Sequence, residues 1–289
     1  MTATLEATQA PTPRATTPRT SAPRKAGRRP RGATLATGVV FLWVGVIVAL
    51  PLAALTVASL ADGPAGFLEA ISAPGAIAAV RTSLVLSVIV AGVNAVAGTV
   101  IAWVLVRDSF PGKSLANAII DLPFALPTIV TSIVLLSLYG PQSPVGIHLN
   151  GTPVGVAVAL AFVTLPFVVR SVQPVFDQLD REAEEAAASL GAGNLTTARR
   201  VVWPAIRPAV ISGTALAFAR SMGEFGAVAL IGGNLPGITQ VTSQYIAQRI
   251  EIGDPAGAAA VSVTLLAISV VVLVLLRLLA RDRRGQEVR

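Results

Sequence analysis

Six long apolar runs constrain the fold of this chain more than any other feature. The runs cover residues 35–60, 82–106, 116–139, 154–175, 209–232 and 257–280. Each is long enough to cross a hydrocarbon core of about 30 Å as a helix rising about 1.5 Å per residue. Only 13% of all residues are charged, against about 25% in ordinary soluble domains. Because no alternating barrel pattern occurs, the runs predict an all-α polytopic membrane protein with six transmembrane helices.

The two ends of the chain differ from these runs. Residues 1–34 hold seven basic residues and one acid among Thr, Pro and Ala, a composition that predicts a disordered tail. The run at 35–60 is too long for a signal peptide and lacks a cleavage site, so it is predicted to be a retained first span. A core at 77–281 holds the other five spans, and residues 282–289 form a second tail.

The distribution of basic residues predicts the orientation in the membrane. With the N-terminus inside, 19 of the 22 lysines and arginines fall on inner segments, two (Arg81 and Arg249) on outer connectors, and Arg220 within a span. This bias places both termini in the cytoplasm. The basic charge is dispersed and has no interleaved aromatic residues, so we expect a lipid bilayer and no nucleic acid as partner.

Residues 176–208, here called the charged loop, join the fourth and fifth runs on the predicted cytoplasmic side. Their composition predicts a helix over 181–190 that Gly191 and Gly193 bring to an end. A second short helix is expected over 196–203, capped by Thr196 or Asn194 and ended by Pro204. Alanines beside two glutamates give the first helix a small-sided face that suits docking into a groove of another protein. The alternative is an ordinary solvated loop.

The charged loop resembles the EAA loop of the permease subunits of ATP-binding-cassette (ABC) importers. Glu185-Ala186-Ala187 is followed after three residues by Gly191, and after nine more by Val201-Val202-Trp203-Pro204. Val201 and Trp203 stand where the family has isoleucine and leucine. The resemblance implies a type I ABC importer permease fold whose cytoplasmic coupling helices seat in a separate ATPase. The coupling residues that it implies are Glu184, Glu185, Ala186, Ala187, Gly191, Val201 and Pro204.

Three further segments, 121–130, 165–175 and 220–234, resemble the sulfate and molybdate branch of these permeases. The second segment and the six-span length favour the T-type subunits of bacterial sulfate/thiosulfate importers. The resemblance implies import of sulfate, and of thiosulfate as a second substrate, across the bacterial inner membrane. It also implies a W-type permease partner, two copies of an ABC ATPase that holds ATP and Mg, and an extracytoplasmic sulfate-binding protein. A molybdate/tungstate permease, an ATP-independent secondary anion carrier and a purely structural membrane anchor stay open as alternatives.

Two charges fall inside a predicted span. Arg220 and Glu224 are placed near the middle of the fifth run, four residues apart and therefore on one helix face. An unpaired charge there costs from about 2.5 to over 10 kcal/mol, so pairing or contact with water is expected. Arg220 could attract an anion where Gly223 and Gly226 allow close approach. Glu224 would repel the anion, which favours a structural or gating role. These four residues are the candidate translocation path or gate.

The chain has no residues arranged for catalysis or for holding a cofactor. It has no cysteine, and its single histidine, His148, falls in a connector rich in proline and glycine. Gly112-Lys113-Ser114 lacks the preceding glycine of a phosphate loop, since Arg107 occupies that position. No paired carboxylates or Ser/His/Asp set lie in the spans. We therefore expect a transport subunit that is not an enzyme and binds no metal or cofactor of its own. Arg170 and Asp121, near cytoplasmic span ends, are expected to snorkel.

Overall fold

The computed structural model describes residues 31–179 and 181–281, and these residues form helices and no strand. The chain divides into a unit over residues 1–50 and a unit over residues 51–289. Helix α1 begins at Arg31, so the last four residues of the predicted disordered tail are helical. The rest of that tail and the tail at 282–289 lie outside the described residues.

The first span is a continuous helical segment made of three parts. Helix α1 (Arg31–Val44) leads through the π-helical turn η1 (Gly45–Ala49) into α2 (Leu50–Ala58). Residues 38–58 are long and apolar enough to cross a membrane, and none of the side chains in this stretch is buried. Pro51 is the second residue of α2, one residue beyond the wider π-helical turn, where the missing N–H of a proline is tolerated. The apolar surface of this segment suits contact with lipid.

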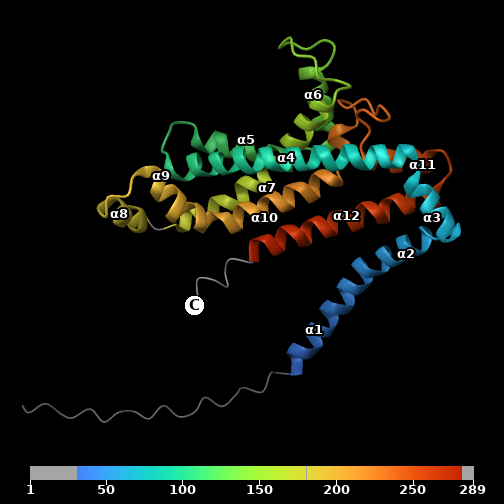
Figure 1. The fold of residues 1–289 in the computed structure, drawn as a ribbon, viewed down its shortest axis with the longest axis horizontal. Helices are drawn as coiled ribbons and strands as arrows, with labels where there is room; N and C mark the ends of the chain where they lie inside the picture. Colours follow the sequence, from blue (N-terminus) through green and yellow to red (C-terminus); the bar gives the residue numbers. More distant parts are fainter. Residues whose placement is uncertain (1–30, 180, 282–289) are drawn as a thin grey trace, which may run out of the picture. The chain divides into compact units, whose positions relative to one another are not determined.

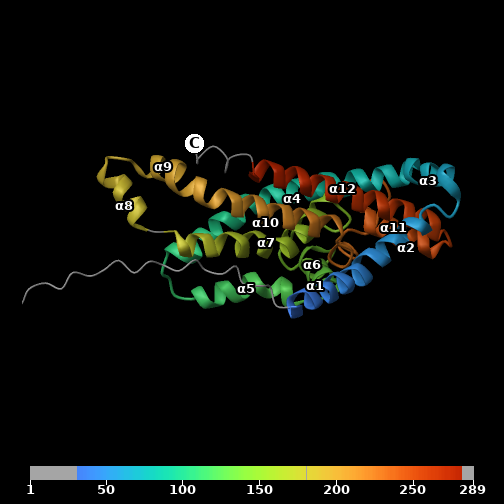
Figure 2. The same ribbon diagram turned by 90° about the horizontal axis from the view of Figure 1, so that it is seen from below.

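Four long helices lie side by side in the second unit (Figures 1 and 2). They are α4 (Pro74–Arg107), α7 (Pro153–Gln178), α10 (Trp203–Met222) and α12 (Pro255–Arg281). Helix α7 approaches α4 and α10 closely at Val168, because a Cβ atom on Gly98 or Gly213 would come within 3.0 Å of this residue. Small residues at such contacts drive helix association in membranes.

The third apolar run folds as two helices. Helix α5 (Lys113–Ala125) and α6 (Thr128–Tyr139) are bent by 116° at the break between them, and Figure 1 shows α6 turning away from the direction of the long helices. The break contains Leu126 and Pro127 in extended conformation. Pro127 thus lies at the break, whereas Pro123 lies within α5. Within residues 31–179 and 181–281, five helices have the length and hydropathy of membrane spans, or six if the bent pair counts as one.

Short helices occupy the two ends of the helix bundle. Helices α8 (Arg181–Ser189) and α9 (Asn194–Thr197) lie at one end, and α3 (Gly63–Ser72) and α11 (Thr242–Glu251) at the other (Figure 1). The sequence did not predict α3 or α11. The charged loop thus lies at the end opposite the connectors that were expected outside.

Candidate functional site

The first half of the charged loop forms the helix that the sequence predicts. Helix α8 ends in a two-bond cap, in which the N–H of Gly191 donates to the carbonyl of Ala188 (2.9 Å) and the N–H of Ala192 to that of Ala187 (3.0 Å). Gly191 has a φ of +85°, a conformation in which a side chain is strained. This cap confirms the predicted glycine stop and sharply turns the chain after α8.

The second half of the charged loop differs from the prediction. Helix α9 is preceded by Gly193 as N-cap and continues through the π-helical turn η2 (Ala198–Val202) into α10. The prediction that Pro204 ends a separate short helix is wrong, because Pro204 lies in the first turn of α10. A proline in the first helical turn removes no hydrogen bond that the α-helix needs, and the wider π-helical turn precedes it.

The charged loop presents a mixed acidic and apolar surface. Leu190 and Leu195, on either side of the glycine turn, are 89% and 82% exposed. Val202, which the sequence did not single out, is buried and anchors the loop in the core. Among the implied coupling residues, Glu185, Ala186, Gly191 and Pro204 are exposed, whereas Glu184, Ala187 and Val201 are half-buried. Exposed leucines on a polar loop leave apolar surface for a partner to cover.

Glu184 ties α8 to the end of α4. Its carboxylate forms an ion pair with Arg107, in the last turn of α4. The exposed fractions of the two side chains are 29% for Glu184 and 13% for Arg107. The neighbouring Glu185 remains exposed. The two adjacent glutamates therefore have different surroundings, one facing this subunit and one facing outward.

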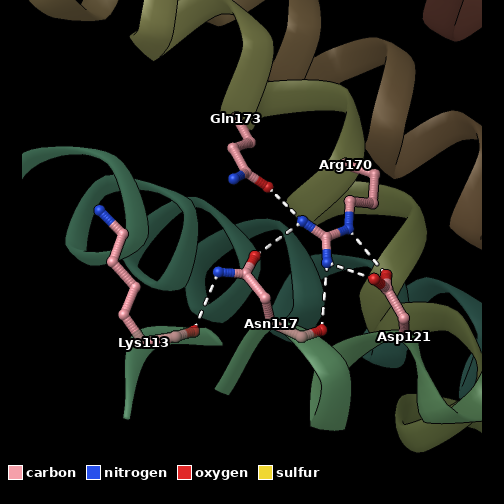
Figure 3. A network of polar contacts seen from close by, with 5 residues as sticks. All are labelled: Lys113, Asn117, Asp121, Arg170 and Gln173. Carbon is pink, nitrogen blue, oxygen red and sulfur yellow. Dashed lines mark hydrogen bonds and ion pairs between the residues drawn. The ribbon is translucent and has the colours of Figure 1, made fainter. Parts of the chain in front are cut away.

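A second group of polar side chains, here called the Arg170 cluster, joins α5 to α7 (Figure 3). It consists of Asn117 and Asp121 on α5 and Arg170 and Gln173 on α7. Arg170 Nε and Nη2 donate to the two carboxylate oxygens of Asp121 at 2.8 and 2.6 Å. The two charges, which were expected to snorkel, neutralise each other across the helices.

The fifth span is shorter than its apolar run. Helix α10 ends at Met222, and the following segment contains the 3₁₀ turn η3 (Gly226–Val228). Ser132 of α6 accepts hydrogen bonds from the N–H groups of Leu230 (2.9 Å) and Ile231 (3.2 Å). The Ser132 hydroxyl thus satisfies backbone N–H groups that would otherwise be satisfied by continuing the helix. Irregular backbone is tolerated at membrane depth where protein groups satisfy it in this way.

Arg220 and Glu224 pair with each other, as expected, but not in the middle of a span helix. Arg220 is in the last turn of α10, and Glu224 lies beyond the helix end. Nη1 of Arg220 is 2.5 Å from Oε2 of Glu224, whose side chain is 1% exposed against 38% for Arg220. Oε1 of Glu224 accepts the N–H of Ala227 at 2.8 Å. The carboxylate is therefore fixed, while the guanidinium keeps open surface.

The start of α6 and the end of α10 meet at a cavity of about 450 Å³, here called the Arg220 cavity. A Cβ atom on Gly226 would lie 3.0 Å from the backbone nitrogen of Ile129 and still closer to the hydroxyl of Thr128, whereas one on Gly223 would meet nothing within 4 Å. Of the two predicted glycines, only Gly226 is required for a close approach. The residues that line the cavity are Pro127, Thr128, Ile129, Arg220, Gly223, Glu224, Phe225 and Gly226.

The remaining polar motifs have local structural roles. Lys113 Nζ donates to the carbonyl of Asp108 at 3.1 Å, and His148 Nδ1 lies 2.8 Å from the carbonyl oxygen of Gly140. Within residues 31–179 and 181–281, no group of three or more His, Cys, Asp or Glu side chains is arranged to hold a metal ion.

Residues 94–285, from the middle of α4 to the C-terminal tail, match the family model described as the inner membrane component of binding-protein-dependent transport systems. The chain belongs to this family. It is therefore a multi-pass membrane transport component and not an enzyme. The match includes the charged loop, the Arg170 cluster and the Arg220 cavity.

Close relatives share most of the permease. The sulfate transport system permease protein CysT of Salmonella typhimurium is 42% identical over 84% of this chain and 90% of its own. The protein of the same name from Escherichia coli is 41% identical over 84% of this chain and 90% of its own. One from Synechocystis sp. is 40% identical over 83% and 87%. These relatives confirm the resemblance to the sulfate branch.

Solved structures share the fold at low sequence identity. A bacterial ABC transporter involved in the import of the acidic polysaccharide alginate matches 88% of the permease and 96% of its own chain with a TM-score of 0.69 at 14% identity. The MetNI methionine ABC transporter, in an inward-facing form, matches 74% and 95% with a TM-score of 0.54 at 19% identity. The predicted importer permease fold is thereby confirmed.

Proposed function

We propose that this permease imports sulfate, with thiosulfate as a second substrate, in an ABC importer powered by a separate ATPase. The observation that carries the proposal is the 42% identity over 84% of the chain to a sulfate transport permease. The segments that resemble the sulfate branch also contribute Asp121 and Arg170 to the Arg170 cluster, and Arg220 and Glu224 to the Arg220 cavity. The matching residues therefore include those that organise the interior of the membrane unit.

The assembly that we propose contains this permease, a W-type permease, two ATPase subunits that hold ATP and Mg, and an extracytoplasmic sulfate-binding protein. Both termini are in the cytoplasm. The exposed surfaces of Glu185, Leu190 and Leu195 support docking of the charged loop into the ATPase. Leucine side chains in a groove remove apolar surface from water, while the glutamate at the edge offers a carboxylate to a basic partner group.

We propose the Arg220 cavity as part of the translocation path, with the Arg220–Glu224 pair as its gate. A guanidinium has five N–H donors, and the pair with Glu224 uses Nη1 of Arg220. Arg220 is 38% exposed beside the cavity, so other donors remain for a passing anion. The carboxylate of Glu224 weakens the attraction, which suits an anion that must enter and leave rather than stay bound.

Uptake of radiolabelled sulfate tests the substrate. Cells that lack their own copy of the gene should regain uptake when the gene is restored, and excess thiosulfate should compete more strongly than molybdate. Recovery of molybdate uptake without sulfate uptake would overturn the substrate assignment in favour of a molybdate/tungstate permease. Uptake that persists after deletion of the ATPase gene would point to a secondary anion carrier.

Reversal of the outward-facing charge tests the coupling. Glu185→Arg should abolish uptake at normal protein abundance, and the ATPase should no longer copurify with the permease. Asp108→Arg is the matched control, because Asp108 is an exposed acid on the inner connector between α4 and α5. Unchanged uptake and copurification in the Glu185→Arg variant would refute docking through this face and favour a purely structural role of the loop.

A further inference from the structure

Helix α5 is attached to the bundle by few apolar contacts. None of its residues is buried. Ala116 and Ile120 pack against the edge of the core cluster, and Phe124 meets Phe167 edge to face with ring centroids 5.0 Å apart. The opposite surface is open, with Leu115 65% exposed. The position of α5 on α7 therefore depends strongly on polar contacts.

Those polar contacts use the full donor capacity of Arg170. Nε and one Nη2 hydrogen reach Asp121, and the other Nη2 hydrogen reaches the carbonyl of Asn117 at 3.1 Å. The two Nη1 hydrogens reach the side-chain oxygens of Asn117 (3.0 Å) and Gln173 (2.5 Å), as Figure 3 shows. All five N–H donors of the guanidinium are thus committed. Arg170 is saturated and has no donor left for an anion.

The far end of α5 leads directly to the Arg220 cavity. After Ala125, only Leu126 and Pro127 separate α5 from α6, and Pro127 has a fixed φ of −56°. Thr128 and Ile129, the first residues of α6, line the cavity and lie against Gly226. A displacement of α5 along or away from α7 would therefore move one wall of the cavity.

We propose that Arg170 is a positioning residue, which sets the aperture of the Arg220 cavity by fixing α5 to α7. This inference rests on the proposed role of the cavity in sulfate passage. Arg170 acts through Asp121 and Asn117 and does not touch the substrate. The planar fork of the guanidinium is essential, because a lysine ammonium cannot span two carboxylate oxygens and three further acceptors on different helices.

A distance measurement tests the attachment without any substrate. The natural chain has no cysteine, so spin labels can be placed at Leu115→Cys on α5 and Asp177→Cys on α7, both exposed positions. In the purified importer the distance distribution should be narrow. It should broaden in Arg170→Ala, Arg170→Lys and Asp121→Asn, and stay narrow in Arg277→Ala. Arg277 is an exposed arginine of α12 for which the structure gives no ion pair with another described residue.

Transport kinetics supply the second readout in the same variants. The maximal rate of sulfate uptake should fall on the order of tenfold, as for other changes along a coupling network, while the KM for the loaded binding protein stays unchanged. Arg170→Lys should resemble Arg170→Ala at matched protein abundance. A narrow distribution in Arg170→Ala, or full transport with Arg170→Lys, would overturn the proposal. If the wild-type permease carried no sulfate, the proposed function would fail, while the spin-label distances would still report on the attachment.

Discussion

Substitution of Gly226 by alanine tests whether the start of α6 must contact the segment that follows α10. In Gly226→Ala the new methyl group would lie 3.0 Å from the backbone nitrogen of Ile129 and 3.0 Å from Cβ of Thr128, and closer to the Thr128 hydroxyl. Two of these three atoms, the nitrogen and Cβ, cannot move without the backbone of α6. The matched control is Gly223→Ala, whose methyl group would meet nothing within 4 Å.

The expected difference in stability follows from comparing the Gly226→Ala and Gly223→Ala variants. Each replacement stabilises the fold by about 0.4–1 kcal/mol by reducing the freedom of the unfolded chain, provided that the backbone conformation accepts alanine. Neither glycine has a positive φ, so this contribution is similar for both and cancels. The overpacking at Gly226 costs about 1–3 kcal/mol. Because 1 kcal/mol shifts the melting temperature by about 2–4 °C in chains of 150–250 residues, the variants should differ by on the order of 5 °C.

The assay is the thermal unfolding midpoint of the purified permease, measured for both variants under identical conditions, together with sulfate uptake. Gly226→Ala should melt lower and transport less than Gly223→Ala. Adding Thr128→Ala removes the shortest contact and should recover part of the lost midpoint. Equal midpoints for the two glycine variants would refute the reasoning, because they would mean that α6 and the segment after α10 are not in contact at Gly226.

Two further predictions concern ion pairs outside the membrane interior. Glu184→Arg and Arg107→Glu should each lower uptake because they place like charges together, and the double exchange should restore part of the lost uptake. Asp108→Arg is the control. A double variant with no more uptake than either single variant would contradict the pairing. The Gly257 N–H and then the Arg249 side chain lower the pKa of Asp254 below its ordinary 3.8. Because the pKa of Asp254 is lowered in the folded state, its ionised carboxylate stabilises the fold above pH 3.8. This stability is lost as the pH falls through the lowered pKa. Asp254→Asn should therefore reduce the unfolding midpoint at neutral pH, and its difference from wild type should fade in acid; a constant difference from pH 7 to about pH 2 would argue against this.

Local sequence signals predicted those features that depend on a short stretch of chain. The apolar runs predicted the spanning helices, because hydropathy alone determines which segments can face lipid. In the third run the break falls at Pro127, which cannot donate a backbone hydrogen bond, whereas Pro123 lies within α5. Alanine and glutamate followed by Gly191 predicted α8 and its end. The family model and the relatives confirm the importer class that the charged loop indicated.

The wrong predictions share a different cause. The run at 209–232 looks like one span by hydropathy, yet α10 ends at Met222. Ser132, about one hundred residues earlier in the sequence, supplies the acceptor for the backbone that leaves the helix. Pro204 was expected to end a helix, but the π-helical turn before it allows the chain to continue into α10. Neither outcome can be read from the neighbouring residues.

The sequence by itself determined that this chain crosses a membrane several times and that its charged loop contains an acidic helix ended by a glycine. These features depend on the transfer of apolar groups and on backbone hydrogen bonds, which are local. Only the tertiary structure decided that Arg107 pairs with Glu184 and that Arg170 donates five hydrogen bonds to Asn117, Asp121 and Gln173. Partners that lie 49 or 77 residues apart along the chain meet only when the helices pack. A buried or half-buried charge requires a partner, but the fold chooses which one.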